Sequence, residues 1–440
     1  MPTTPSVSVA PKASSRAAAQ GSALALVQVV SLFFLWGVAN NLNDILIKQF
    51  KNAFELTDFQ SGLVQSAFYL GYFLFALPAG LFMRRYGYKG GIVFGLFLYA
   101  AGTFLFYPAA NARTYSFFLI ALFVIASGLA FLETSANPFI TVLGPPEGAE
   151  RRLNLAQAFN PLGSITGVLI GRFFIFSGIE YTPQQLAALS PTARNAYLAA
   201  ESAAVRTPYL TLGVLVALLG VAIFFTRFPS LPADAPPRNA ERGAWRGLLH
   251  RRRFLFAVVA QFFYVGAQVG IWSYLIRYTQ AAVPGVSEKS AADLLVLSLV
   301  LFMLGRFAGA GLMRFIAPAK LLAACAVVNA ALLAIAVMRP APLGIAALIG
   351  SSFFMSLMYP TIFALGIHGL GELRKLASSM LVMAIIGGAV LTPVMGGLSA
   401  IGGIHWSMAV PLCCFGIIFA FAAYARRADP GRLPHGDAAH

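Results

Sequence analysis

Apolar runs long enough to cross a membrane follow one another along almost the whole chain. A helix needs about 20 predominantly apolar residues to span the hydrocarbon core of a bilayer. Short polar segments separate the runs, and no stretch has the composition of a separate soluble domain. The pattern predicts an all-α membrane protein with twelve transmembrane helices, near residues 24–48, 59–83, 91–110, 115–143, 152–178, 207–227, 254–280, 291–315, 320–338, 342–366, 377–399 and 405–425.

Composition agrees with this interpretation. Of the 440 residues, 59% are hydrophobic and 10% are charged, whereas soluble domains carry about 25% charged residues. The net charge of +16 comes from short basic clusters between apolar runs, which is not a nucleic-acid-binding pattern. The three cysteines lie within apolar runs without metal-ligand spacing or a disulfide framework. We therefore expect a lipid bilayer as the surroundings, and no nucleic acid, metal or cofactor.

Basic residues predict the orientation of the chain in the membrane. The predicted tails and even-numbered connections contain 21 Lys and Arg residues, and the opposite loops contain six. Cytoplasmic loops carry such an excess. We therefore expect both termini in the cytoplasm and the protein in a bacterial inner membrane.

The distribution of polar segments predicts two six-helix halves joined by a linker. Residues 228–253 are rich in Pro and charge, as in a connecting segment. FFLWG and FFYVG begin related motifs in the first and seventh spans, and NPFITVLG in the fourth span is similar to YPTIFALG in the tenth. Two parallel repeats with a binding site between them at the membrane midplane are the plan of major facilitator transporters. The predicted units are a disordered tail at 1–22, a half at 23–227, the linker at 228–253, a half at 254–426 and a tail at 427–440.

Of the 15 Asp and Glu residues, only Asp44 and Glu133 lie inside apolar segments. An ionisable residue within a membrane is a functional candidate by default. Burial disfavours the charged form of a carboxyl group, which suits a proton carrier. The alternatives are an ordinary i,i+4 pair between Asp44 and Lys48, and a permanently neutral Glu133 that bonds neighbouring helices. We predict that both acids take part in proton coupling.

Neutral polar and aromatic side chains within the spans are candidates for a sugar site, because hydroxyls need hydrogen-bond partners and the C–H face of a sugar packs on flat rings. Four of them recur at steps of three and four residues along one stripe of the seventh span. Any single amide could instead bond two helices. We expect Trp36 in the core or an interface. Snorkelling toward headgroups explains Arg277 and Arg306 about as well as a functional role does, so both are left out of the predicted site. The predicted substrate-binding residues are Asn43, Glu133, Asn137, Gln157, Asn160, Gln261, Tyr264, Gln268, Trp272 and Tyr359, with Gln65 as a further lining candidate.

Several longer blocks resemble the bacterial L-fucose permease family, which are proton-coupled sugar symporters of the major facilitator superfamily. The blocks include FFLWGVANNLNDILIKQF, ETSANPFITVLGP, RLNLAQAFN and YPTIFALGI. The resemblance covers about residues 28 to 420. It implies that Asp44 takes part in proton translocation, that Glu133 links sugar binding to the proton, and that Gln157 and Asn160 contact sugar. The chain departs from the family at Met358, where the permease has Gln, and at Arg84, where the superfamily loop motif carries Asp.

The resemblance implies a secondary transporter that imports a monosaccharide, with L-fucose as the leading substrate, together with a proton by alternating access. Importers of glucose, galactose or N-acetylglucosamine in the same family are alternatives. A proton-driven exporter of apolar compounds fits less well, because the polar candidates suit a hydroxylated solute. We do not expect an enzyme or an obligate protein partner, since the sequence contains no nucleophile motif and no soluble effector domain.

Overall fold

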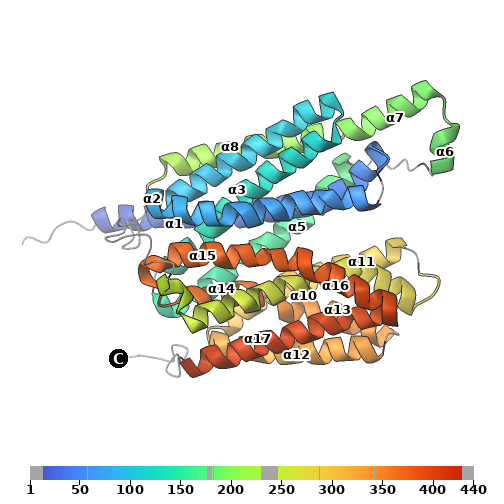
Figure 1. Cartoon of the computed structure of the whole chain (residues 1–440). Helices are drawn as coiled ribbons and strands as arrows, with labels where there is room; N and C mark the ends of the chain where they lie inside the picture. Colours follow the sequence, from blue (N-terminus) through green and yellow to red (C-terminus); the bar gives the residue numbers. More distant parts are fainter. Residues whose placement is uncertain are drawn as a thin grey trace, which may run out of the picture.

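The structure is a computed structural model that describes residues 13–56, 58–143, 145–175, 181, 183–228, 246–286, 288–339 and 342–428. Two helical bundles lie side by side, one drawn in blue to green and one in yellow to red (Figure 1). The first bundle contains α1 (Ala13–Ala53), α2 (Asp58–Ala112), α3 (Tyr115–Val142), α4 (Ala149–Gln157), α5 (Phe159–Ile170), α6 (Pro183–Ala188), α7 (Pro191–Ala203) and α8 (Arg206–Phe225). The second contains α10 (Arg252–Ala282), α11 (Glu288–Leu312), α12 (Pro318–Met338), α13 (Pro342–Met355), α14 (Met358–Ile367), α15 (Arg374–Met383), α16 (Gly387–Gly402) and α17 (Ala409–Ala428).

The helices account for the twelve predicted spans. Within the described residues, eleven helical segments are long and apolar enough to cross a membrane. One of them, Leu63–Ala112, has 50 residues, enough for two spans. The backbone of Gly87 interrupts it with a φ of 73°, a conformation that glycine adopts readily. The predictions of 59–83 and 91–110 as separate spans therefore agree with the structure.

Three spans that the sequence predicts as continuous are broken. Ala158 separates α4 from α5, residues 356–357 separate α13 from α14, and a short 3₁₀ turn at Ala384–Ile386 separates α15 from α16. Proline explains the first two breaks, because Pro161 and Pro360 are each the third residue of the helix that follows. A proline fits the first turn of a helix but cannot donate to the carbonyl four residues earlier.

The tails and the linker fall largely outside the described residues. Residues 1–12, 229–245 and 429–440 are not described. The predicted disordered tail at 1–22 is wrong for its second part, because α1 begins at Ala13. The segment ASSRAAAQ is rich in alanine, which has the highest helix propensity.

Two acids outside the apolar segments are also buried. Glu150 at the start of α4 is 1% exposed, and Glu201 near the end of α7 is 4% exposed. Glu201 Oε2 accepts a hydrogen bond of 2.8 Å from Gln49 on α1. Both residues lie in connections between predicted spans, but α4 packs against α14 and α11, and α7 packs against α1. A position between predicted spans therefore does not imply exposure.

Glycines bring helices into very close contact within each half. A Cβ atom on Gly37 of α1 would lie 2.0 Å from the carbonyl oxygen of Asn160 on α5, and one on Gly163 would lie 1.9 Å from that of Phe34. Gly387 of α16 approaches the carbonyl oxygen of Phe262 on α10 in the same way, at 2.0 Å. Small residues permit such backbone contact in membranes, so α1 with α5 and α10 with α16 form tight pairs.

The two halves contact one another on the side where α1 begins and α17 ends (Figure 1). Ser378 on α15 donates through Oγ to the carbonyl oxygen of Thr134 on α3 at 3.0 Å. Asn154 Nδ2 on α4 donates to Thr361 Oγ1 on α14 at 3.1 Å. All four residues are fully buried. We call these the termini-side contacts, and they close the interface between the halves on this side.

Candidate functional site

A cavity of about 240 Å³ lies between the two halves. Its wall comes from α1 to α5 in the first half and from α10, α11, α14 and the turn before α16 in the second. Amides, aromatic rings, one carboxyl group and one guanidinium group form the polar part of the wall. These residues are Trp36, Asn40, Asn41, Asn43, Gln65, Tyr69, Tyr72, Glu133, Gln157, Asn160, Gln268, Trp272, Arg306 and Tyr359.

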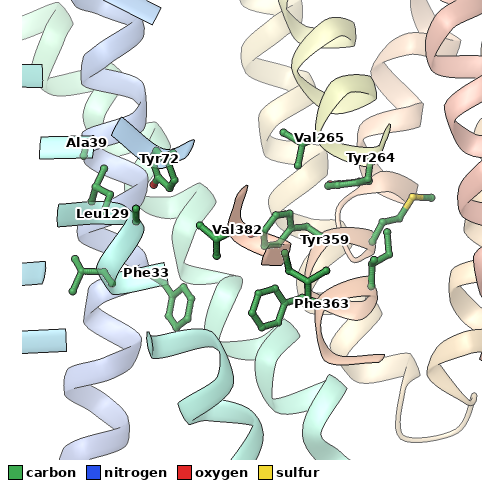
Figure 2. Close-up of a cluster of buried hydrophobic side chains, with 14 of the residues drawn as sticks. Phe33, Ala39, Tyr72, Leu129, Tyr264, Val265, Tyr359, Phe363 and Val382 are labelled. Atoms are coloured by element: carbon green, nitrogen blue, oxygen red, sulfur yellow. The ribbon is translucent and has the colours of Figure 1, made fainter. Parts of the chain in front are cut away.

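Glu133 and Tyr359 join the two halves in the wall of this cavity. Glu133 on α3 is 1% exposed, and its Oε1 accepts a hydrogen bond from the hydroxyl of Tyr359 on α14. Its Oε2 is buried and accepts no hydrogen bond within the described part of the chain. Figure 2 shows Tyr359 between Tyr264 and Phe363, and its ring lies 6.2 Å and 6.4 Å from theirs. The carboxyl group therefore keeps one oxygen available for a ligand while the other bonds the opposite half.

The break between α4 and α5 places Gln157 and Asn160 in the same wall. Gln157 Nε2 donates to Asn137 Oδ1 on α3 at 2.9 Å. Asn160 Nδ2 donates to the carbonyl oxygen of Phe33 on α1 at 3.3 Å. The predicted ligand contact of Asn137 is not supported, because this residue is fully buried and lies behind the wall. Asn137 instead orients the Gln157 amide.

The stripe along α10 lines the cavity over only half its length. Gln268 and Trp272 are in the wall, whereas Gln261 and Tyr264 are fully buried outside it. Tyr264 donates to the carbonyl oxygen of Met355 at 2.9 Å. The four positions do share one helical face, but α14 covers the part of that face around Tyr264, whose ring lies 6.2 Å from that of Tyr359. Gln261 and Tyr264 are therefore not in the wall of this cavity, and their contact with a ligand stays a prediction.

The first half contributes a polar cluster from α1 and α2. Asn43 is 2% exposed, and its Nδ2 donates to Gln65 Oε1 at 3.1 Å. Both residues are in the wall. The backbone of Asp44 follows in α1, but the side chains of Asp44 and Lys48 lie outside the described part of the chain. The proton-coupling role of Asp44 and the alternative ion pair both remain predictions.

Arg306 on α11 is in the wall, although the predicted site left it out and snorkelling was one of its two open explanations. Its side chain is 4% exposed and crosses between the halves. Nη1 donates to the carbonyl oxygen of Gln157 at 2.7 Å, and Nε donates to that of Ser356 at 2.9 Å. Both carbonyls lack the usual helical donor four residues later, because Pro161 and Pro360 stand there and have no N–H. That spacing is the sequence signal that could have indicated a buried donor here.

Two other sequence expectations also change. Trp36 lines the cavity and is not simply a core residue, although nothing in its apolar surroundings distinguishes it in the sequence. Met358, the position where the chain departs from the permease pattern, is fully buried and lies outside the wall. We therefore expect no direct contact between Met358 and a ligand in this cavity.

Comparison with known proteins identifies the family. The family model described as Major Facilitator Superfamily matches residues 24–381. This chain belongs to the major facilitator superfamily.

Two relatives show which members of the superfamily the chain is similar to. It is 48% identical to the L-fucose-proton symporter of Escherichia coli strain K12 over 400 residues, which cover 90% of this chain and 91% of the relative. It is 38% identical to the glucose/galactose transporter of Brucella abortus strain 2308 over 397 residues, which cover 90% and 92%. The resemblance found in the sequence blocks is therefore confirmed over nearly the full length.

Solved structures support the same fold. A crystal structure of a major facilitator superfamily transporter, FucP, in the outward conformation matches with a TM-score of 0.84 at 47% identity, covering 91% of this chain and 98% of that one. A second FucP crystal structure matches with a TM-score of 0.85 at 46% identity and the same coverage. The all-α major facilitator fold predicted from the sequence is confirmed.

Proposed function

We propose that this chain is a secondary active transporter that imports a monosaccharide, with L-fucose as the first candidate, together with a proton by alternating access. The observation that carries the proposal is the buried carboxyl group of Glu133, which sits in the wall of the cavity and bonds Tyr359 of the opposite half. The names of the similar proteins, which are fucose-proton symporters and glucose/galactose transporters, support the substrate class.

The chemistry of the wall suits a neutral, hydroxylated solute. Amides such as Gln157, Asn160 and Gln268 supply both donors and acceptors for hydroxyl groups, and the indoles of Trp36 and Trp272 supply flat faces for C–H groups. The substrate of an exporter of apolar compounds would displace water from the amide atoms that face the cavity without replacing its hydrogen bonds, which costs free energy at each unsatisfied group. The wall therefore favours sugar over an apolar substrate.

Glu133 can link sugar occupancy to proton occupancy. A protonated carboxyl group can donate a hydrogen bond to a sugar hydroxyl, whereas an ionised one can only accept. Sugar that prefers the protonated form makes the proton bind more tightly in return, because coupling between two ligands is reciprocal. The hydrogen bond from Tyr359 in the second half also depends on the charge of this carboxyl group. Loading of proton and sugar can thereby change how strongly the halves hold together.

Proton coupling fits the wall better than sodium coupling. A sodium site gathers several oxygen ligands, often from unwound backbone. Among the described lining residues, Glu133 is the one carboxylate, and Arg306 already occupies the carbonyl oxygens of Gln157 and Ser356 at the helix breaks. A guanidinium group at these carbonyls repels a second cation.

A glucose or galactose importer is the second candidate, and N-acetylglucosamine import follows it. The glucose/galactose transporter of B. abortus is similar over 90% of the chain, and the lining amides do not by themselves select one hexose. We further propose that the protein lies in a bacterial inner membrane with both termini cytoplasmic, on the basis of the positive-inside distribution of Lys and Arg. The termini-side contacts then face the cytoplasm.

Uptake of labelled sugars by the purified protein in proteoliposomes tests the proposal. L-fucose, glucose, galactose and N-acetylglucosamine are offered separately under an inward proton gradient, under a sodium gradient, and under neither. We expect accumulation of one of these sugars under the proton gradient alone. Strict dependence on sodium, or no uptake of any of the four sugars, would contradict it.

A further inference from the structure

The orientation of the Trp272 indole is fixed from behind the cavity wall. Its Nε1 donates a hydrogen bond of 3.1 Å to Ser352 Oγ on α13. Ser352 Oγ in turn lies 2.5 Å from Ser298 Oγ on α11. Both serines are fully buried and neither is part of the cavity wall. The indole N–H is therefore bonded to one hydroxyl group behind the wall, and that hydroxyl is bonded in turn to a second one.

A second contact restricts the indole further. The ring of Phe302 on α11 lies 4.9 Å from the Trp272 ring at an interplanar angle of 77°, which is a favoured edge-to-face arrangement. Rotation of the indole away from its position would break the bond to Ser352 and also lose this ring contact. The flat face that Trp272 presents to the cavity is thus held in a single orientation.

We propose that Ser352 and Ser298 are positioning residues that hold Trp272 as a rigid platform for the C–H face of the sugar. The inference rests on the proposed function, because it needs a sugar as the ligand. Ser352 is the central member: its oxygen accepts from the indole N–H, so its own hydroxyl hydrogen is free to point to Ser298. Preorganisation of this kind raises affinity because the free protein has already lost the rotamer freedom that binding would otherwise remove.

All members of this arrangement belong to the second half. Trp272, Ser298, Phe302 and Ser352 lie on α10, α11 and α13, so movement of one half against the other leaves their contacts intact. The hydrogen bond between Tyr359 and Glu133 differs, because it crosses between the halves. The platform can therefore keep the same shape on both sides of the transport cycle, while the bonds that cross the interface change.

A double-mutant cycle with L-fucose as the probe tests the inference, using binding calorimetry on the purified full-length protein. We expect Ser352→Ala to weaken binding about five- to tenfold, the effect of one lost hydrogen bond, and Ser298→Ala to weaken it less. In a Trp272→Phe background, Ser352→Ala should have no further effect, because it acts only through the indole. Ser351→Ala is the matched control. That neighbouring hydroxyl is equally buried but bonds only the carbonyl oxygen of Leu348 in its own helix, at 2.7 Å, and its loss should leave affinity unchanged.

The outcomes separate the inference from the proposed function. If Trp272→Phe weakens binding but Ser352→Ala behaves like Ser351→Ala, the positioning role is wrong and sugar binding stands. Equal losses from Ser352→Ala with and without Trp272 would show a general structural effect and overturn the inference as well. If the wild-type protein binds none of the four sugars, the proposed function itself fails. Because the chain has four tryptophans, the part of the tryptophan emission that Trp272→Phe removes gives a second readout. Ser352→Ala, but not Ser351→Ala, should shift that part, since only the former frees the indole N–H.

Discussion

Single side chains carry the chemistry of the cavity, and only some of them could be predicted from the sequence. Glu133 could be identified because placing a carboxyl group in a charge-free membrane span costs free energy, so a functional role is expected for it. Trp36 was not, because an aromatic residue in an apolar span has the same composition whether it faces lipid, core or cavity. Arg306 was left out of the predicted site because its distance from the end of the span allowed snorkelling as well as function, and the sequence did not show the position of the carbonyls that it binds. The residue type predicts the free-energy cost of burying a side chain in the membrane. The direction in which the side chain points depends on how the helices pack.

Tyr359→Phe tests the bond between the halves at this scale. The change keeps the ring and its contacts but removes the hydroxyl that donates to Glu133. A hydrogen bond to a charged group contributes about 1.5–3 kcal/mol, so the ionised form of Glu133 should become harder to reach. We expect sugar exchange to continue, since it needs no deprotonation, while accumulation driven by a proton gradient falls about tenfold or more. Both are measured as labelled uptake into proteoliposomes.

Tyr264→Phe is the matched control for this variant. Its ring lies beside that of Tyr359, but its hydroxyl bonds the carbonyl oxygen of Met355 within the same half. It should keep most of the accumulation. Equal losses in the two variants would mean that a buried tyrosine hydroxyl is needed for packing and not for coupling.

At the scale of the helices, hydropathy predicts the bounds of the membrane spans well but does not predict interruptions within them. The predicted spans at 254–280 and 320–338 agree with α10 (Arg252–Ala282) and α12 (Pro318–Met338) to within a few residues, because the bilayer imposes length and apolarity together. Hydropathy alone does not show the breaks in the middle of three spans, because the apolar pattern continues through them. At two of the three breaks, a freed carbonyl accepts a hydrogen bond from the distant Arg306. The same limit explains why the stripe on α10 was predicted to line the cavity over its full length.

Gly163→Ala tests the close pairing of α1 and α5. The added methyl group would lie 1.9 Å from the carbonyl oxygen of Phe34, so the two helices must separate. Overpacking of this kind costs about 1–3 kcal/mol, and we expect a lower thermal unfolding temperature in detergent together with reduced transport. Gly416→Ala on α17 is the control, because no heavy atom lies within 4 Å of the added group. A Gly163→Ala protein as stable as the control would contradict the account of this pair.

At the scale of the whole molecule, the contacts between the two halves decide how the protein moves. The repeat in the sequence predicted two halves but not these contacts. The sequence predicted a site between the halves, but it did not predict which residues hold them together. The termini-side contacts join α3 to α15 and α4 to α14. Their residues are buried small polar side chains, which in a sequence are indistinguishable from residues that bond helices within one half. Alternating access requires these contacts to form and break in each cycle.

Cross-linking tests this movement. A Cβ atom on Gly80 of α2 would lie 2.8 Å from Cβ of Ser379 on α15, and disulfides join Cβ atoms about 3.5–4.5 Å apart. A Gly80→Cys, Ser379→Cys protein should therefore form a disulfide between the halves after a small separation. We expect oxidation to block uptake and reduction to restore it, with Ser379→Cys alone insensitive to the oxidant. Full uptake by the cross-linked protein would show that the halves need not separate on this side.

The central claim is that one carboxyl group senses both the sugar and the proton. The most direct measurement is L-fucose affinity across about pH 5 to 9, compared between the wild type and Glu133→Gln by calorimetry. The amide keeps the shape of the side chain and its ability to donate to a hydroxyl, but it cannot titrate. The wild type should bind sugar more weakly as pH rises, whereas Glu133→Gln should bind with nearly constant affinity and fail to accumulate sugar. A wild-type affinity without pH dependence, or a Glu133→Gln protein that retains the wild-type dependence, would contradict the claim and leave Glu133 as a residue that only bonds the two halves.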